Sequence, residues 1–177
     1  MTAPEVSVDD RFVLLEHDAG WSRTFDAERA RLVPALRDLA VVIEHVGATS
    51  VPGVRSQPVV DVLVGLRDPA DRDAVTGQLV AAGYERRPAF DGDGLRYLRR
   101  RWLGDGDTIV CAWVAPVAGD FFVRHVAFRD RLRARPDLAA RYSSLKARMA
   151  ADPGQPHAAY EAAKRAFVQE AMEHDDC

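Results

Sequence analysis

The chain has 177 residues, 47% of them hydrophobic, and its 24 basic and 27 acidic side chains leave a net charge of −3. This composition suits a single domain over residues 1–177 with its own core, and it argues against a protein whose whole surface binds nucleic acid. The two distant cysteines suggest no disulfide framework, residues 1–10 lack a secretion signal and no apolar run approaches the ~20 residues that span a bilayer, so we expect a cytoplasmic protein without membrane contact.

The first elements are predicted from short apolar runs and from helical spacing. Residues 12–16 are apolar and β-prone, and we predict a first strand there. Residues 21–39 carry apolar side chains three, four and seven positions apart, which predicts an amphipathic helix. Pro34 lies inside this helix and removes one backbone donor, so we expect a kink or break near Val33.

Two strands and a helix follow. Residues 40–46 and 59–64 are predicted to be strands, and the near-continuous valines of the second favour burial on both faces. Residues 69–82 are predicted to be a helix that Gly83 ends.

The middle of the chain alternates apolar and basic residues between turns rich in Asp and Gly, which predicts antiparallel strands. They are expected at 84–87, 95–102 and 108–114. The second contains Arg96, Arg99, Arg100 and Arg101 and is interpreted as a solvated edge strand, because charge protects an edge from pairing. The last third predicts three helices, at 120–135, 136–151 and 155–173. Together these elements indicate an α+β fold, a sheet flanked by helices with a helical C-terminal third.

The segment 44–61, E-H-V-G-A-T-S-V-P-G-V-R-S-Q-P-V-V-D, is the strongest candidate for chemistry. Backbone can approach a ligand closely at Gly47, and the Thr49 and Ser50 hydroxyls beside it suit phosphate oxygens. Asp61 interrupts an apolar strand, where an acid is costly without a partner, and a carboxylate is a ligand that Mg²⁺ prefers. The alternatives are an ordinary tight turn with a helix N-cap and, for His45, a structural histidine in place of a base or ligand.

The runs H-V-G-A-T-S-V-P-G at 45–53 and Q-P-V-V-D at 57–61 resemble the signature of GrpB-like proteins. The resemblance continues in the family's order through the last three predicted helices, at Phe128-Arg129-Asp130, Leu132-Arg133, Tyr142, Leu145-Lys146, Tyr160, Lys164 and Phe167. The family in turn resembles the nucleotidyltransferase superfamily. It therefore implies a nucleotidyltransferase-like mixed sheet, ATP or another nucleoside triphosphate as substrate, and Mg²⁺ held by Asp61 as the catalytic carboxylate.

The same resemblance raises four helical residues to candidates for substrate binding, namely Arg129, Lys146, Tyr160 and Lys164. From the sequence they could equally be surface or salt-bridge residues. The chain also departs from the family pattern at Ala48, at Gln57 and at 111–113, where a histidine-bearing strand is expected.

The superfamily's second acidic position falls on Leu63, and a two-metal site needs several carboxylates. Four acids are candidates for a further ligand, and the sequence does not select among Glu44, Asp91, Asp93 and Asp107. The remaining unusual residues are interpreted as structural: Trp21, Trp102 and Trp113 as core or interface aromatics, and Cys111 as an inert buried thiol.

Two hypotheses follow. The first is an enzyme that binds a nucleoside triphosphate with Mg²⁺ and transfers its nucleotidyl group, or uses such activation to join a small-molecule acceptor to another group. The second is a catalytically degenerate module that binds a nucleotide or another anion without turnover, as Leu63, Ala48 and Gln57 suggest. A basic-strand nucleic-acid binder is disfavoured by the net negative charge.

Overall fold

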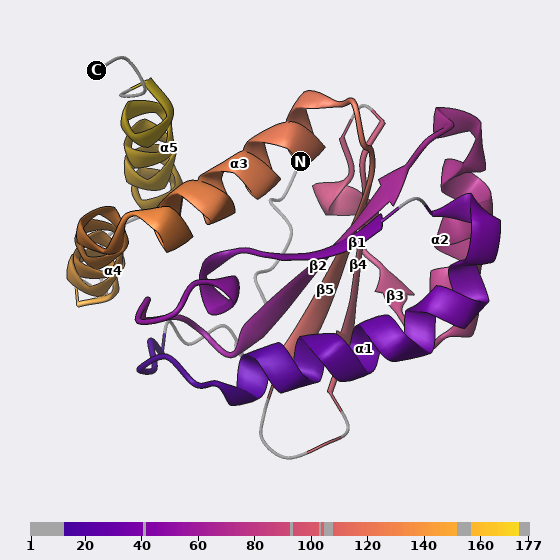
Figure 1. Ribbon diagram of the computed structural model, residues 1–177, viewed down its shortest axis with the longest axis horizontal. Helices are drawn as coiled ribbons and strands as arrows, with labels where there is room; N and C mark the ends of the chain where they lie inside the picture. The colour runs from indigo at the N-terminus through magenta and orange to yellow at the C-terminus, as the bar shows by residue number, and fades with distance from the viewer. Residues whose placement is uncertain are drawn as a thin grey trace, which may run out of the picture.

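The computed structural model describes residues 13–40, 42–92, 94–102, 104, 108–151 and 157–173, and within it the strands form one five-stranded mixed sheet in the order β1-β2-β5-β4-β3 (Figure 1). The strands are β1 Val42–Val46, β2 Val59–Leu66, β3 Glu85–Arg86, β4 Arg96–Arg101 and β5 Ile109–Pro116. β2 and β5 run parallel, and the other neighbours run antiparallel. The helices are α1 Gly20–Leu36, α2 Arg72–Ala81, α3 Asp120–Ala134, α4 Pro136–Ala150 and α5 His157–Glu173. This arrangement confirms the α+β prediction and its helical C-terminal third.

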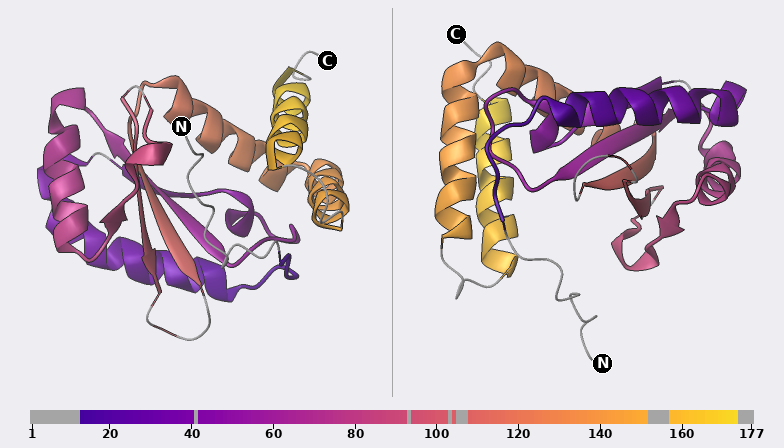
Figure 2. Two further views of the ribbon diagram at one scale, coloured as in Figure 1. Left: turned by 180° about the vertical axis from the view of Figure 1, so that it is seen from behind. Right: turned by 90° about the horizontal axis from the view of Figure 1, so that it is seen from below.

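The first face of the sheet is covered by α1 and α2 (Figure 2). Val60, Val62 and Val64 alternate along β2 and pack into this core, because every second side chain of a strand points to the same face. Leu32 of α1 and Leu79 of α2 are fully buried against them. The first face is therefore a closed hydrophobic layer.

Glu28 lies within the apolar stripe of α1 and is 0% exposed. Tyr84 donates a hydrogen bond to its carboxylate at 2.6 Å, and Arg31 and Arg100 also contact it. These partners compensate the burial of the charge. Burial raises the pKa of the Tyr84 hydroxyl, and the neighbouring Glu28 charge and hydrogen bond raise it further.

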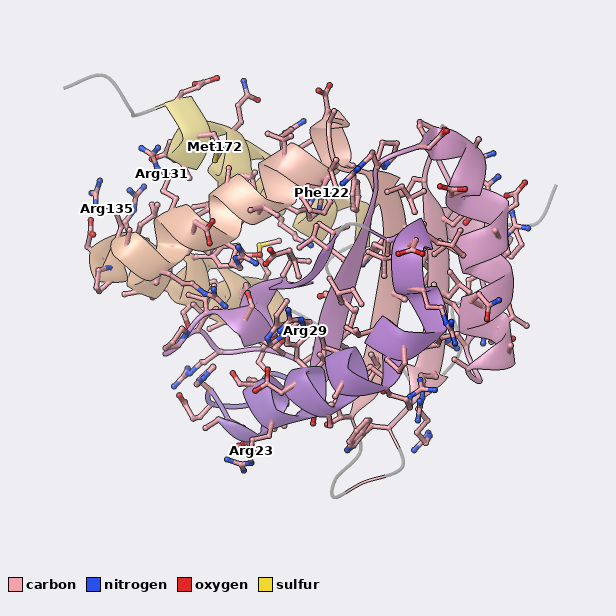
Figure 3. The ribbon with its side chains drawn as sticks, turned by 45° about the vertical axis from the view of Figure 1, so that its right-hand side comes forward. Arg23, Arg29, Phe122, Arg131, Arg135 and Met172 are labelled. Carbon is pink, nitrogen blue, oxygen red and sulfur yellow. The ribbon has the colours of Figure 1, made fainter. Side chains whose placement is uncertain are left out.

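The second face of the sheet meets α3. Leu63 of β2 packs in a buried cluster with Val46, Ala115 and Phe122, the last of these from α3. Figure 3 shows Phe122 at the sheet end of α3, with Arg131 and Arg135 at its far end. α3 thus covers one part of the second face and leads away from it.

α4 and α5 stand side by side beyond the far end of α3 and join a cluster of their own (Figure 1). Val51 and Val54, from the loop before β2, are buried there against Leu132, Tyr142 and Phe167. This packing holds the loop that leads into β2 against the C-terminal helices.

Two local predictions are wrong. The described part of the expected first strand, residues 13–16, forms a single bridge from Leu15 to Ser56, and Leu15 is 44% exposed. Residues with high β-propensity form a strand only where neighbouring strands are available for pairing and packing. Of the kink or break expected near Val33, the break is absent, since α1 continues through Pro34 to Leu36.

The interpretation of 96–101 as an edge strand is wrong as well. β4 lies between β5 and the two-residue β3. Arg100 points to the first face and contacts Glu28, while Arg96 lies near Asp73 and Asp91. Arg100 therefore pairs with a fully buried acid, whereas Arg96 lies between the exposed Asp73 and the mostly buried Asp91. Among the described residues, no helix is both long and apolar enough to cross a bilayer.

Candidate functional site

Asp61 lies on the second face of the sheet, near the start of β2. Its neighbours across the sheet are Val46 on β1 and Cys111 on β5. Leu63, two residues further along the same face, is sealed beneath α3, whereas Asp61 is partly exposed. The acid predicted from the sequence therefore occupies the part of this face that the α3 cluster leaves open.

The Asp61 carboxylate accepts a hydrogen bond from Trp113 and lies against Gly47. Trp113, on β5, donates its indole N–H to Oδ1 at 3.1 Å. A Cβ built on Gly47 would come within 2.2 Å of Oδ2, so the absence of a side chain at Gly47 makes room for the carboxylate. Burial raises the pKa of the Asp61 carboxyl, although the Trp113 bond and the charges of Lys164 and Lys146 oppose this shift.

Two lysines from the C-terminal helices, Lys146 and Lys164, interact electrostatically with the Asp61 carboxylate. Lys146 of α4 is 6% exposed, and its Nζ lies 3.3 Å from Ser56 Oγ in the loop before β2. Burial and the like charge of Lys164 on α5 together lower the pKa of Lys146 to about 8, although the charge of Asp61 opposes the shift. The structure thus brings together Asp61, Lys146 and Lys164, three of the residues predicted from the sequence.

Gly47 begins the turn after β1 with φ +73° and ψ −179°, a region that glycine adopts readily. The two hydroxyls of the turn are buried. Thr49 donates to the carbonyl of Val59 at 2.9 Å, and Ser50 donates to the carbonyl of Gly47 at 2.6 Å. A phosphate contact with either hydroxyl would have to replace one of these bonds.

His45 supports this turn from the first face. Its Nε2 lies 3.1 Å from Thr49 Oγ1, and its ring stacks on Phe25 of α1 with centroids 4.7 Å apart. Burial lowers the pKa of His45 to about 3, and the charges of Arg133 and Arg129 act in the same direction. The imidazole is therefore neutral at physiological pH and fixes the turn in place.

Arg129 clamps α3 to β1. Its guanidinium donates to Glu44 Oε2 at 2.6 Å and to the carbonyl of His45 at 3.0 Å, and it also contacts Asp130. Glu44 lies directly across from Leu63, the position of the superfamily's second acid. The carboxylate nearest to that position is thus already bound by an arginine.

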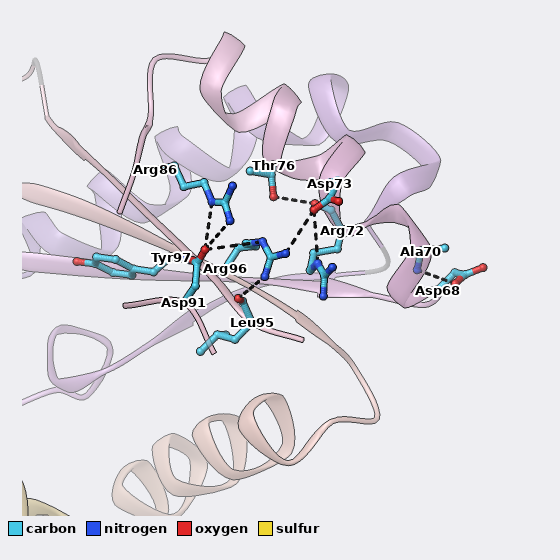
Figure 4. Close-up of polar contacts among 10 residues, drawn as sticks. All are labelled: Asp68, Ala70, Arg72, Asp73, Thr76, Arg86, Asp91, Leu95, Arg96 and Tyr97. Atoms are coloured by element: carbon cyan, nitrogen blue, oxygen red, sulfur yellow. Dashed lines mark hydrogen bonds and ion pairs between the residues drawn. The ribbon is translucent and has the colours of Figure 1, made fainter. Parts of the chain in front are cut away.

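Asp91, another acid considered as a metal ligand, has partners of its own away from Asp61. Asp91 is held by Arg86 at 2.7 Å and by the backbone N–H of Tyr97 at 2.9 Å, with Arg96 nearby (Figure 4). Its partial burial would raise the pKa of the carboxyl, but the Tyr97 and Arg86 hydrogen bonds hold it below the usual value. Asp93 and Asp107 lie outside the described residues. Within the described part of the chain, no group of three or more His, Cys, Asp or Glu side chains is placed to hold a metal ion.

The chain is similar to known proteins over almost its whole length, since residues 11–174 match the family described as GrpB protein. The chain belongs to the GrpB family. It is 33% identical over 159 residues to a UPF0157 protein of Halalkalibacterium halodurans, covering 90% of this chain and 80% of that one. It is 27% identical over 164 residues to the glutamate-rich protein GrpB of Alkalihalophilus pseudofirmus, covering 90% and 93%. The crystal structure of conserved protein GrpB from Enterococcus faecalis has a TM-score of 0.71 to it at 27% identity, over 91% of this chain and 100% of that one.

Membership of the GrpB family accounts for the spacing of the motif residues in the last three helices. Lys146 and Lys164 reach the Asp61 region from α4 and α5, and Arg129 ties α3 to the sheet. Tyr160 falls in α5, but its side chain lies outside the described residues.

Sequence reasoning missed Trp113 as a partner of the acid in this GrpB-family chain. It was interpreted as a core aromatic, yet its indole contacts Asp61 and its ring lies 4.3 Å from that of Tyr97. A signal was present, because Trp113 and Cys111 alternate on one strand and therefore share a face. The missing information was the parallel register that pairs Cys111 with Asp61.

A groove of about 600 Å³ between α4 and α5 lies apart from this chemistry. Its lining includes Leu145 and Phe167, together with Arg141 and Glu170, which form an ion pair with each other. Asp61 is not among the residues that line it. The described residues that line the groove include no lysine, so the groove lacks the carboxylate and lysine pair found at Asp61. The candidate site is therefore the Asp61 region.

Proposed function

We propose that this protein binds a nucleoside triphosphate over the open part of the second face and transfers its nucleotidyl group to a small-molecule acceptor. The observation that carries the proposal is the partly exposed residue Asp61 beside Gly47, with the charges of Lys146 and Lys164 acting on its carboxylate. The proposal includes assignment of the mixed sheet to the nucleotidyltransferase-like folds, in which a glycine turn precedes an acid-bearing strand.

The charges support an anionic ligand. Lys146 and Lys164 repel each other, and burial adds to the cost of the charge on Lys146. The carboxylate of Asp61 offsets one of the two positive charges at most. A bound triphosphate would relieve the remaining repulsion and would be held by charge-assisted hydrogen bonds.

The donor set fits a Mg²⁺ ion held jointly by protein and substrate. Mg²⁺ is commonly bound through one or two carboxylates together with substrate phosphates, and no arginine in the described part of the chain forms an ion pair with Asp61. It does not fit a pair of ions, because Glu44 is bound by Arg129 and Leu63 is buried. When bound, Mg²⁺ would supply neutralisation of phosphate charge.

The residues of the chain then have distinct roles in the proposal. Lys146 and Lys164 bind the phosphates and stabilise negative charge as it develops in the transition state. Gly47 leaves space beside the Asp61 carboxylate, and its turn is held rigid by Thr49 and Ser50. The Arg129 clamp fixes β1 relative to α3.

A second candidate is nucleotide binding without turnover. The observation that favours it is Leu63, which is 0% exposed and packed in a hydrophobic cluster where a second acid would be expected. Such a module would use the same phosphate contacts. It would lack the additional carboxylates that hold the two metal ions in enzymes with a two-metal mechanism.

Isothermal titration of ATP in the presence of Mg²⁺ or Mn²⁺ tests binding. We expect Asp61→Asn to weaken metal-dependent binding at least tenfold, whereas the matched Asp26→Asn variant, on the exposed side of α1, should bind as the unaltered chain does. Absence of nucleotide binding under both metal conditions overturns the proposal.

Pyrophosphate release separates the two candidates. Labelled ATP is incubated with the protein and a broad panel of small hydroxyl, amine and carboxylate acceptors. Release that depends on Asp61 establishes turnover and rules out the binding module. Tight ATP binding without pyrophosphate release in the presence of any acceptor favours the binding module.

A further inference from the structure

Beside the Asp61 carboxylate the structure places a row of aromatic rings in contact, and Phe90 packs against the outer one, Tyr97, with ring centroids 5.2 Å apart. The four rings nearest the carboxylate come from three elements: β4, β5 and α3. Tyr97 and Trp113 have ring centroids 4.3 Å apart, Trp113 and Phe121 5.2 Å, and Phe121 and His125 3.9 Å. We name these residues, Tyr97, Trp113, Phe121 and His125, the aromatic row.

The row is open to solvent along its length. Tyr97, Trp113 and Phe121 are partly exposed, and His125 is exposed. A second aromatic group in the same protein shows the contrast: Tyr142 is 4% exposed and Phe167 is 8% exposed, both within the α4 and α5 core. Exposed aromatic surface that is contiguous, unlike single exposed rings, marks binding sites more often than packing.

Three polar atoms of the row already have protein partners. Trp113 Nε1 donates to Asp61 Oδ1 at 3.1 Å, and Tyr97 Oη lies 2.9 Å from Cys111 Sγ. His125 Nδ1 lies 2.6 Å from the carbonyl oxygen of Phe121. These bonds fix the rings in orientation. What they leave for a ligand is ring surface, which suits a planar group that stacks.

The row adjoins the phosphate-binding charges. Trp113 contacts Asp61 directly, and the charge of Lys164 acts on both Asp61 and His125. Neighbouring strands lie ~4.8 Å apart, so Tyr97 on β4 is about 10 Å from β2 across the sheet. A ligand held by its phosphates near Asp61 therefore has aromatic surface within reach.

We propose that the aromatic row is the subsite that stacks on the nucleobase of the bound nucleotide. The inference rests on the proposed function and adds to it the part of the ligand that the second face recognises. Aromatic side chains stack on any base, because each base has a π-face, so this subsite favours nucleotides over bare polyphosphates without selecting strongly among bases.

The test compares ATP with inorganic tripolyphosphate, which has the phosphates but no base. Both are titrated calorimetrically with Mg²⁺. The unaltered protein is expected to bind ATP at least about tenfold more tightly than tripolyphosphate, a ratio within the range of base stacking on aromatic side chains. In Phe121→Leu the ratio is expected to fall several-fold while tripolyphosphate binding stays unchanged.

Phe128→Leu is the matched control, because it makes the same substitution on the same helix in a ring that faces Tyr142 and Phe167. It should leave the ratio unchanged. Tyr97→Leu provides a second variant within the row, so the test does not depend on one substitution folding well. Circular dichroism confirms that each variant retains its helices.

The outcomes are distinct. Equal affinity for ATP and tripolyphosphate in the unaltered protein overturns the stacking subsite and leaves the proposed function standing. A base-dependent ratio that survives both Phe121→Leu and Tyr97→Leu also overturns it, because the base must then bind elsewhere. Failure of both ligands to bind overturns the proposed function itself.

Discussion

Gly47 leaves the space beside it to the Asp61 carboxylate, with no room for a side chain of its own. A Cβ built on Gly47 would lie 2.2 Å from Asp61 Oδ2 and 3.1 Å from its Cγ. Gly47 directly follows β1, whose last residue, Val46, pairs with Asp61 on β2. The position of the Asp61 carboxylate therefore depends on a glycine at the start of this turn.

Gly47→Ala should destabilise the protein for two reasons. The backbone at φ +73° and ψ −179° is strained for any other residue, at a cost of about 1–3 kcal/mol, and the new methyl group displaces the Asp61 carboxylate. We expect a lower free energy of unfolding by urea denaturation and weakened ATP binding.

A double-mutant cycle separates the two causes. In Gly47→Ala combined with Asp61→Gly the clash disappears while the backbone strain remains. The double variant should therefore be more stable than the sum of the single effects predicts, by about 0.5–3 kcal/mol. If the two single effects on the free energy of unfolding simply add, the contact between residues 47 and 61 contributes nothing to stability.

Asp61→Asn should not destabilise the fold. Burial raises the pKa of the Asp61 carboxyl, so the folded state holds that proton more tightly than the unfolded chain does, and ionisation above the folded pKa costs stability. Asparagine removes this cost and can still accept the Trp113 hydrogen bond. We expect a gain of about 0.5–2 kcal/mol at neutral pH, which raises Tm by ~2–4 °C for each kcal/mol.

The pH dependence provides the control. The difference in Tm between Asp61→Asn and the unaltered protein should shrink as the pH falls through the folded pKa, because Asp61 is then protonated. A Tm several degrees lower at neutral pH would mean that Asp61 stabilises the fold, and its role as a functional carboxylate would lose its main support.

Anion binding should weaken above about pH 8, where Lys146 loses its charge because burial and the like charge of Lys164 lower its pKa to about 8. When one proton is required for binding, the affinity falls up to about tenfold per pH unit above the pKa of the free protein. Calorimetric titration of Mg²⁺ and tripolyphosphate between pH 7 and 9.5 measures this decline.

Two variants assign the decline to Lys146. Lys146→Met should bind weakly and lose the pH dependence around pH 8. Lys164→Met should move the midpoint of the decline to higher pH, because one source of the depressed pKa of Lys146 is removed. A midpoint that does not move in Lys164→Met would argue against direct coupling of the two amines.

Tyr84→Phe should destabilise the protein without affecting ligand binding. The Tyr84 hydroxyl donates to the fully buried Glu28 at 2.6 Å, and a hydrogen bond to a charged group contributes about 1.5–3 kcal/mol. The site is on the other face of the sheet, so the ATP affinity should be unchanged. Tyr97→Phe should cost less stability, because the partner of that hydroxyl is the sulfur of Cys111, a weak hydrogen-bonding atom.

The sequence predicted the main secondary structure well where periodicity was strong. β2, with its run of valines, and α1, with apolar residues at helical spacing, lie close to their predicted bounds. It failed at residues 13–16 and at β4, because strand formation and edge exposure depend on which other strands lie alongside. Glu28 shows the same limit, since its burial depends on partners as distant in sequence as Tyr84 and Arg100.

For the site, the sequence by itself determined the local chemistry: an acid in an apolar strand, a glycine turn before it, and family motifs in the last helices. Tertiary structure alone decided which of these residues meet. It brought Lys146 and Lys164 to Asp61, gave the Thr49 and Ser50 hydroxyls backbone partners, and placed Trp113 against the carboxylate. The physical reason is that the side-chain type and its spacing are local properties, whereas strand register and helix packing set the distances between residues far apart in the chain.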